Sequence, residues 1–149
     1  MACNERTIDA TPEQIWAVLA DARSYARWVV GAKDIRTVDD TWPEPGSRLH
    51  HTVGFGPLQL KDNTKVLECE APRLLVMEAR GRPVGIARIE LRLEPQGSGT
   101  KVTMIEYALR PDPVKLMNPA LDPLIHSRNT ESLRRLEEAT RERIGTAAT

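Results

Sequence analysis

Between residues 32 and 109, hydrophobic residues tend to recur at every second position, and this period limits the possible folds more than any other feature of the chain. In residues 87–93, Ala, Ile, Leu and Leu alternate with Arg, Glu and Arg, so one face of a strand would be apolar and the other polar. The turns between periodic segments are rich in Pro and Gly and are too short for the crossovers that parallel strands need. The pattern therefore predicts an antiparallel meander. Its expected strands are Asp34–Val38, Arg48–Phe55, Leu58–Glu70, Leu74–Arg80, Ile86–Glu94 and Thr100–Leu109.

One more strand and two short helices are expected before this stretch. Residues Cys3–Ile8 are consistent with a short strand. Thr11 can then cap a helix that has a proline in its first position, and Gln14 can complete a capping box. Asp21 can cap a second short helix, which Gly31 would end. Two short helices therefore separate the first two strands.

The last third of the chain is predicted to form mainly one long helix, Leu124–Ile144. Ile125, Leu133 and Leu136 fall on one side of it, and oppositely charged residues four positions apart fall on the other. A sheet needs cover on one face, and this helix is the element long enough to provide it. The expected fold class is α+β: a seven-stranded antiparallel sheet wrapped around the C-terminal helix. Because the chain has 149 residues, we expect residues 1–149 to form a single domain.

The charge balance and hydropathy argue against several classes of partner. Lys and Arg together number 21, as do Asp and Glu, so the formal net charge is zero. A protein that binds nucleic acid normally carries a basic excess, so we expect no nucleic-acid partner. No apolar run approaches the roughly 20 residues that cross a bilayer, and the N-terminus lacks the pattern of a signal peptide. A cytoplasmic protein without a membrane span, either monomer or homodimer, is expected.

The sequence does not predict a metal site or a cofactor. His50 and His51 are adjacent on an expected strand, so their side chains should face opposite sides of the sheet. His126 lies on the last helix, and neither Cys3 nor Cys69 belongs to a cluster with metal-ligand spacing. We find no phosphate-binding glycine loop and no nucleophile motif. We therefore expect no cofactor and no metal.

Three ionisable residues fall in rows of otherwise apolar side chains that should face the helix. A two-residue turn after Phe55 would pair His51 with Asp62 across two strands, and Glu106 shares its face with Met104. A histidine oriented by a carboxylate is the usual general base, and a buried glutamate can act as an acid. His51, Asp62 and Glu106 are thus candidate catalytic residues. The same groups could instead satisfy one another, orient a ligand or sit in water at a cavity mouth, and a bulge could turn Asp62 outward.

The inward-facing rows also predict a cavity between the sheet and the last helix. We expect a volume of roughly 300–1,000 Å³, the usual range for small-molecule sites, and a small apolar ligand as its occupant. Arg128 and Asn129 lie where the helix could face this space. The expected ligand-binding residues are Leu49, Val53, Leu60, Met77, Ile89, Met104, Leu121, Ile125 and Asn129. Burial would favour the neutral form of Glu106 unless a cation such as Arg128 reaches it.

Several local strings, together with the order of elements, resemble the START-like helix-grip superfamily. Within it, the chain is most similar to the polyketide cyclase/dehydrase and lipid-transport group, also called SRPBCC. The similarity extends over nearly the whole chain. The matching residues are 11–21 (TPEQIWAVLAD), Tyr25 and Trp28, Gly46-Ser47-Arg48, Pro72, residues 99–103 (GTKVT) and the arginine-rich last helix.

The resemblance implies a deep cavity that holds lipids, polyketides or other apolar molecules, but it does not choose one activity. Some members of the superfamily are enzymes, many are carriers or sensors, and some act on partner proteins. We therefore expect the chain to bind or carry a small hydrophobic molecule. The alternatives are an enzyme of the cyclase/dehydrase kind, using His51, Asp62 or Glu106 for proton transfer, and a protein-interaction module.

Overall fold

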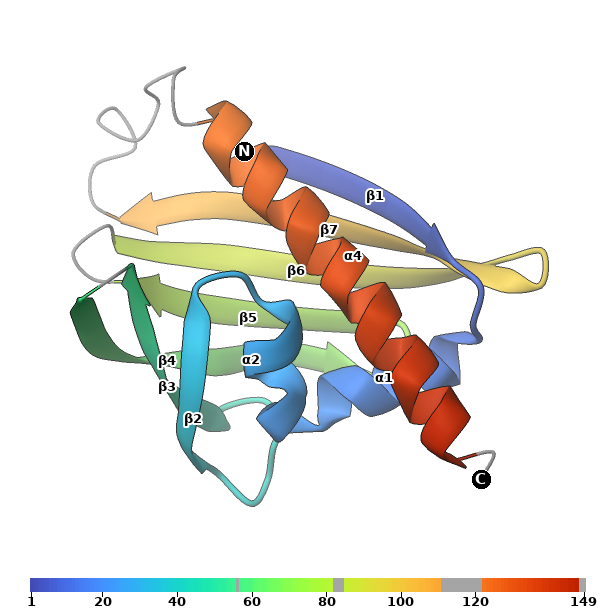
Figure 1. The fold of residues 1–149 in the computed structure, drawn as a ribbon, viewed down its shortest axis with the longest axis horizontal. Helices are drawn as coiled ribbons and strands as arrows, with labels where there is room; N and C mark the ends of the chain where they lie inside the picture. Colours follow the sequence, from blue (N-terminus) through green and yellow to red (C-terminus); the bar gives the residue numbers. More distant parts are fainter. Residues whose placement is uncertain (56, 82–84, 111–121, 148–149) are drawn as a thin grey trace.

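A seven-stranded antiparallel sheet and a long helix that crosses it diagonally dominate the computed structural model (Figure 1). The structure describes residues 1–55, 57–81, 85–110 and 122–147. The strands lie in the order β1-β7-β6-β5-β4-β3-β2, and every neighbouring pair is antiparallel. The elements are β1 (Ala2–Ile8), α1 (Pro12–Ala20), a 3-10 turn (Ala22–Ser24), α2 (Tyr25–Trp28), β2 (Ala32–Val38), β3 (Arg48–Phe55), β4 (Leu58–Glu70), β5 (Leu74–Gly81), β6 (Gly85–Gln96), β7 (Gly99–Arg110) and α4 (Asp122–Ala147). The predicted α+β fold is confirmed.

The predicted start of α1 is also confirmed. The Thr11 hydroxyl accepts a hydrogen bond from the Gln14 backbone at 3.2 Å, and the Gln14 side chain accepts one from the Thr11 backbone at 2.9 Å. These bonds satisfy two donors that the end of a helix would otherwise leave unpaired. The second short helix differs from the expectation, because Asp21 caps a 3-10 turn and α2 follows as a single turn.

The hairpin of β3 and β4 sets the register on which the site depends. Phe55 pairs with Leu58, so His51 lies opposite Asp62, as the short turn predicted. The register of β4 against β5 shifts only later, between Val66 and Glu68. The bulge therefore comes after Asp62, which stays on the inner face and is buried.

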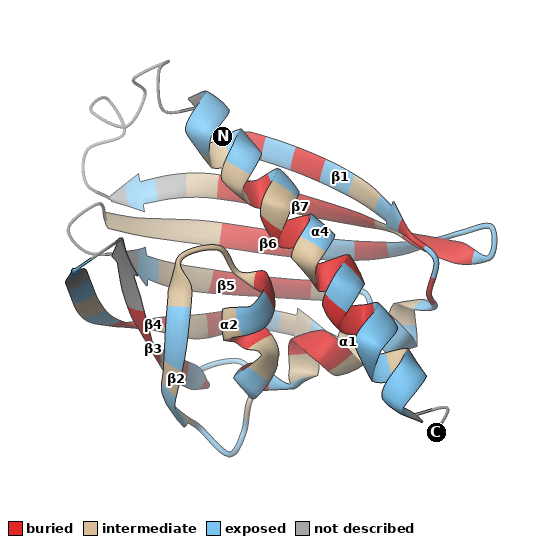
Figure 2. Ribbon diagram, in the orientation of Figure 1, coloured by how far each residue is buried: buried red, intermediate tan, exposed pale blue. Residues whose placement is uncertain are grey.

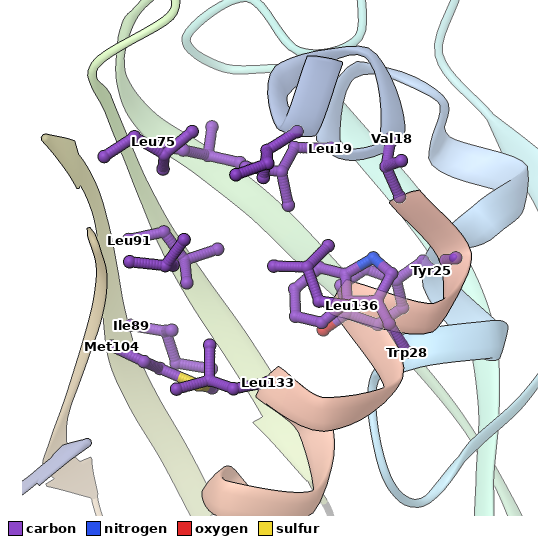
Figure 3. Packing of buried hydrophobic residues seen from close by; sticks show 14 of the residues in the cluster. Val18, Leu19, Tyr25, Trp28, Leu75, Ile89, Leu91, Met104, Leu133 and Leu136 are labelled. Carbon is purple, nitrogen blue, oxygen red and sulfur yellow. The ribbon is translucent and has the colours of Figure 1, made fainter. Parts of the chain in front are cut away.

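The hydrophobic core lies between the inner face of the sheet and the helices. Along β1, buried and exposed residues alternate, as Figure 2 shows, which is the pattern of a strand with one dry face. Leu133 and Leu136 of α4 belong to one core cluster with Leu91 and Met104 from the sheet (Figure 3). Tyr25 and Trp28 extend this cluster from α2. No helix in the described part of the chain is long and apolar enough to cross a membrane.

Candidate functional site

Polar side chains from five elements are buried in this largely aliphatic interface and form two hydrogen-bonded groups. We call the first group the hydroxyl–imidazole chain; it consists of Tyr25 on α2, Thr64 on β4 and His51 on β3. The second, called here the carboxylate–guanidinium group, consists of Glu106 on β7 with Arg128 and Asn129 on α4. Only the Arg128 side chain is substantially exposed, at 40%. All the other members are less than a tenth exposed.

The hydroxyl–imidazole chain is linear. The hydroxyl oxygens of Tyr25 and Thr64 are 3.1 Å apart, and the Thr64 oxygen lies 3.0 Å from Nε2 of His51. The tyrosine ring also stacks on the imidazole, with ring centroids 5.5 Å apart and planes inclined by 24°. Nδ1 of His51 is buried without a hydrogen-bond partner. Since buried polar atoms are nearly always paired, this nitrogen is an exception that calls for an explanation.

His51 is held in its neutral form by its surroundings. Burial lowers the pKa of its imidazole to about 4; the nearby Asp62 carboxylate opposes this shift, while Arg36 and His50 add to it. Arg36 reaches this region because its guanidinium donates to the backbone carbonyls of His51 and Asp62, at 3.1 and 3.0 Å. A general base works best when its pKa is near the operating pH. His51 is therefore a weak base at neutral pH.

The predicted pairing of His51 with Asp62 is confirmed in the backbone register but not as a bond to the ring. The imidazole bonds Thr64 instead, and Oδ1 of Asp62 accepts the backbone N–H of Asn63 at 3.0 Å. The expectation that Asp62 orients the imidazole by a direct hydrogen bond is wrong. Thr64, two residues further along the same inward row, reaches Nε2, and Nδ1 makes no hydrogen bond.

Glu106 faces inward, as predicted, and its carboxylate is fully engaged. One terminal nitrogen of Arg128 lies 2.6 Å from Oε1 and 2.5 Å from Oε2, and Nδ2 of Asn129 donates to Oε2 at 2.8 Å. This is the geometry of a guanidinium–carboxylate pair, in which both carboxylate oxygens serve as hydrogen-bond acceptors. Among the two alternatives for Glu106, the structure therefore favours the ion pair over the general acid.

The two groups lie within electrostatic reach of each other. Burial raises the pKa of the Tyr25 hydroxyl, while the bond to Thr64 and the charge of Arg128 lower it and the charge of Glu106 raises it. The net shift is upward, so Tyr25 keeps its proton. Tyr25 and Thr64 were not among the predicted site residues. Their signals were present, since Thr64 shares the inward row of Asp62 and Tyr25 lies on the apolar side of its helix.

The predicted lining residues divide into three sets. Leu49, Met77, Ile89 and Met104 are buried in the core cluster, and Asn129 is fully buried. Leu60 and Ile125 are half-buried. Leu121 and the side chain of Val53 lie outside the described residues. Because part of its expected lining lies there, the internal cavity stays a prediction.

The structure does show a pocket of about 330 Å³, on the opposite face of the sheet. It lies over β5 and β6 and contains both carboxylates and guanidinium groups above an apolar floor. Its lining residues are Glu68, Arg73, Leu74, Val76, Glu90, Arg92, Leu93 and Glu94. None of them was predicted to bind a ligand. Among the described residues, no three His, Cys, Asp or Glu side chains are grouped so as to hold a metal ion.

Comparison with known proteins decides the family. Residues 4–141 match the family described as polyketide cyclase / dehydrase and lipid transport. The chain belongs to this family. Membership indicates a role in binding hydrophobic ligands or in cyclisation, in agreement with the resemblance found in the sequence. No curated protein sequence matches the chain significantly.

Solved structures confirm the fold at low sequence identity. Protein NE0264 from Nitrosomonas europaea superposes with a TM-score of 0.74 at 18% identity, over 96% of this chain and 95% of that one. Protein MLL2253 from Mesorhizobium loti gives 0.67 at 19% identity, over 95% and 96% of the two chains. The di-domain ARO/CYC StfQ from the steffimycin biosynthetic pathway gives 0.73 at 9% identity, over 96% of this chain and 51% of that one. Identities this low support a shared fold rather than a shared activity.

Proposed function

We propose that this chain binds a small, mainly apolar molecule between the sheet and α4, with the polar end of the molecule at the two hydrogen-bonded groups. The observation that carries the proposal is the burial of Tyr25, His51 and Glu106 inside an interface of Leu, Ile and Met side chains. A few convergent polar groups in an apolar setting are typical of small-molecule sites. Family membership supports the same function.

The geometry favours binding over acid–base catalysis. An enzyme of the cyclase/dehydrase kind would need a proton acceptor and a proton donor that work near neutral pH. The imidazole of His51 has a pKa of about 4, and the carboxylate of Glu106 is held by Arg128 and Asn129. Both groups can orient a ligand in these states, whereas neither is prepared to move a proton.

Native mass spectrometry of freshly purified protein tests the proposal. We expect part of the population to carry a small organic molecule, which denaturation releases. Arg128→Ala should lower this fraction, because the half-exposed guanidinium is the most accessible polar member of the site. Arg134→Ala is the matched control, since Arg134 lies on the same helix but pairs with the exposed Glu131 and Glu138.

Two further measurements keep this test decisive. Arg128→Ala leaves the buried Glu106 carboxylate without its cation, so the double variant Glu106→Gln/Arg128→Ala separates loss of binding from loss of stability. A fluorescent apolar probe, 1-anilinonaphthalene-8-sulfonate, covers the case in which the natural ligand is lost on purification. If the native protein has only the mass of the chain and the folded protein does not bind the probe, the binding proposal is wrong.

A further inference from the structure

Counting protons along the hydroxyl–imidazole chain shows that the site lacks one hydrogen-bond acceptor. Tyr25, Thr64 and neutral His51 each carry one polar hydrogen. The three groups make only two hydrogen bonds with one another, and Nδ1 of His51 has no partner. One polar hydrogen is therefore left over, whichever way the bonds run. A buried donor without an acceptor is rarer and costlier than an underused acceptor.

Three arrangements of the two bonds are possible, and each leaves this hydrogen on a different residue. In the first direction, Tyr25 donates to Thr64, Thr64 donates to Nε2, and the unpaired hydrogen is on Nδ1 of His51. In the second direction, Nε2 donates to Thr64, Thr64 donates to Tyr25, and the unpaired hydrogen is on the tyrosine hydroxyl. In the third arrangement, Tyr25 and Nε2 both donate to Thr64, and the unpaired hydrogen is on the Thr64 hydroxyl. The second and third arrangements also leave the lone pair of Nδ1 unused, so without a ligand the first direction leaves the fewest unpaired groups.

The tyrosine end of the chain faces the rest of the site. The Tyr25 hydroxyl lies within electrostatic reach of both Glu106 and Arg128, whereas the charged groups nearest the imidazole, Asp62 and Arg36, belong to the strands of the sheet. The carboxylate–guanidinium group also has donors to spare. Both oxygens of Glu106 are engaged, and in its bonds to the described residues Arg128 uses one terminal nitrogen.

We propose that the ligand carries a hydrogen-bond-accepting oxygen that takes the hydrogen of the Tyr25 hydroxyl, and that its arrival reverses the direction of the hydroxyl–imidazole chain. This inference rests on the proposed binding function and names the chemical class of the ligand. The Tyr25 hydrogen moves to Thr64 and the Thr64 hydrogen moves to Nε2, while one proton leaves Nδ1 of His51 for water and one enters from water at Tyr25, so the total is unchanged. The ligand-bound protein then has its imidazole hydrogen on Nε2, and every polar hydrogen of the chain has an acceptor.

The inference excludes ligands that bring only donors. An alkylammonium offers no acceptor to Tyr25, and the Glu106 oxygens that would receive it are already occupied. A hydrocarbon leaves the surplus hydrogen unpaired. Carbonyl and carboxylate oxygens both complete the chain, and the spare nitrogens of Arg128 can assist them.

Binding of three probes with the same chain length tests the ligand class: 2-decanone, decanoate and decylamine. We expect Tyr25→Phe to weaken binding of 2-decanone and decanoate by about 3- to 10-fold, the effect of one hydrogen bond. Decylamine should bind neither the wild type nor the variant measurably. Tyr107→Phe is the matched control. Tyr107 is the other tyrosine of the chain and lies opposite Arg88, in the row that faces away from α4.

The tautomer of His51 gives a second readout, in the wild-type protein. Nitrogen-15 spectra at neutral pH should show the imidazole hydrogen on Nδ1 in the free protein and on Nε2 in the ketone complex, with His50 and His126 unchanged. If the probes bind but Tyr25→Phe has no effect, or if His51 keeps one tautomer throughout, the inference is wrong while the binding function stands. A copurified amine or hydrocarbon would also overturn it. If the native protein carries no ligand and none of the probes binds, the proposed function itself is wrong.

Discussion

Among single residues, His51 shows how position and chemistry are set by different parts of the chain. Its inward direction follows from strand parity, and its opposite residue, Asp62, follows from the two-residue turn; both were predicted and found. The hydrogen-bond partner of the ring was not predicted, because it depends on side-chain rotamers. Arg36 was missed for a related reason: it lies where the register of β2 against β3 shifts, and a pattern of period two cannot reveal such a shift.

The lowered pKa of His51 predicts that this residue makes the protein less stable in acid. The unfolded imidazole takes up its proton near pH 6.5, while the folded one resists protonation until about pH 4. Below pH 6.5 the unfolded state therefore binds more protons than the folded state. The free energy of unfolding consequently decreases as the pH is lowered from 6.5 to about 4. The loss reaches at most about 3 kcal/mol by pH 4.

Urea unfolding at pH 7 and pH 4.5 measures this effect. Relative to His51→Gln, the wild-type protein should lose roughly 2–3 kcal/mol of stability between the two pH values. The carboxylates are present in both proteins, so their contributions largely cancel. His50→Gln is the control, because that ring lies on the other face of β3, and it should behave as the wild type. If the difference in unfolding free energy between the wild type and His51→Gln stays constant with pH, the imidazole is protonated normally in the folded protein.

For helices and strands, the prediction from sequence succeeded where a local signal was strong. The capping box placed the start of α1 correctly, and alternation placed the six strands from β2 to β7. The prediction was less accurate between Asp21 and Trp28, where the expected helix is divided into a 3-10 turn and one α-helical turn. An apolar pattern of so few residues fits both helix types, and packing against the core decides between them.

The close contact of β7 with β1 predicts a strong effect of Gly99→Ala. A Cβ at this position would lie 2.6 Å from the backbone oxygen of Ile8. Because the clashing atom belongs to the backbone of Ile8, it cannot turn away as a side chain could, and one strand must shift. We expect the free energy of unfolding to fall by about 1–3 kcal/mol. The next residue of β7, Thr100, ties the same region together, because its hydroxyl donates a hydrogen bond to the Ala10 carbonyl at 2.7 Å.

Gly145→Ala is the matched control for this substitution. Gly145 lies in α4, and its Cβ would meet nothing within 4 Å. Alanine favours a helix over glycine by up to about 1 kcal/mol, so this variant should be slightly more stable than the wild type. Thermal unfolding of both variants measures the contrast. Equal stability of Gly99→Ala and the wild type would mean that β1 and β7 yield at this point without cost.

At the scale of the whole molecule, the sheet, α1, α2 and α4 share one core, but whether α4 leaves space for a ligand beneath it was not predictable from sequence. Strand parity named which side chains face inward, and Leu49, Met77, Ile89 and Met104 are indeed buried. Whether such side chains fill a space or line it depends on the sum of their volumes and on how closely α4 approaches the sheet. No local pattern in the sequence predicts the distance between α4 and the sheet.

Leu136 provides a central contact between α4 and the rest of the molecule. Leu136 is completely buried and belongs to the same core cluster as Tyr25 and Trp28 of α2 and Leu91 of β6 (Figure 3). Replacing it with alanine removes apolar contacts and leaves a cavity, which typically costs about 2–5 kcal/mol. We expect Leu136→Ala to fall in this range by urea unfolding. Leu124→Ala is the matched control on the same helix, since Leu124 is 66% exposed, and its effect should stay within about 0.5 kcal/mol. A cost below 1 kcal/mol for Leu136→Ala would mean that α4 settles onto the sheet once the side chain is shortened, so that the helix is not held at a fixed distance and the site beneath it is not preformed.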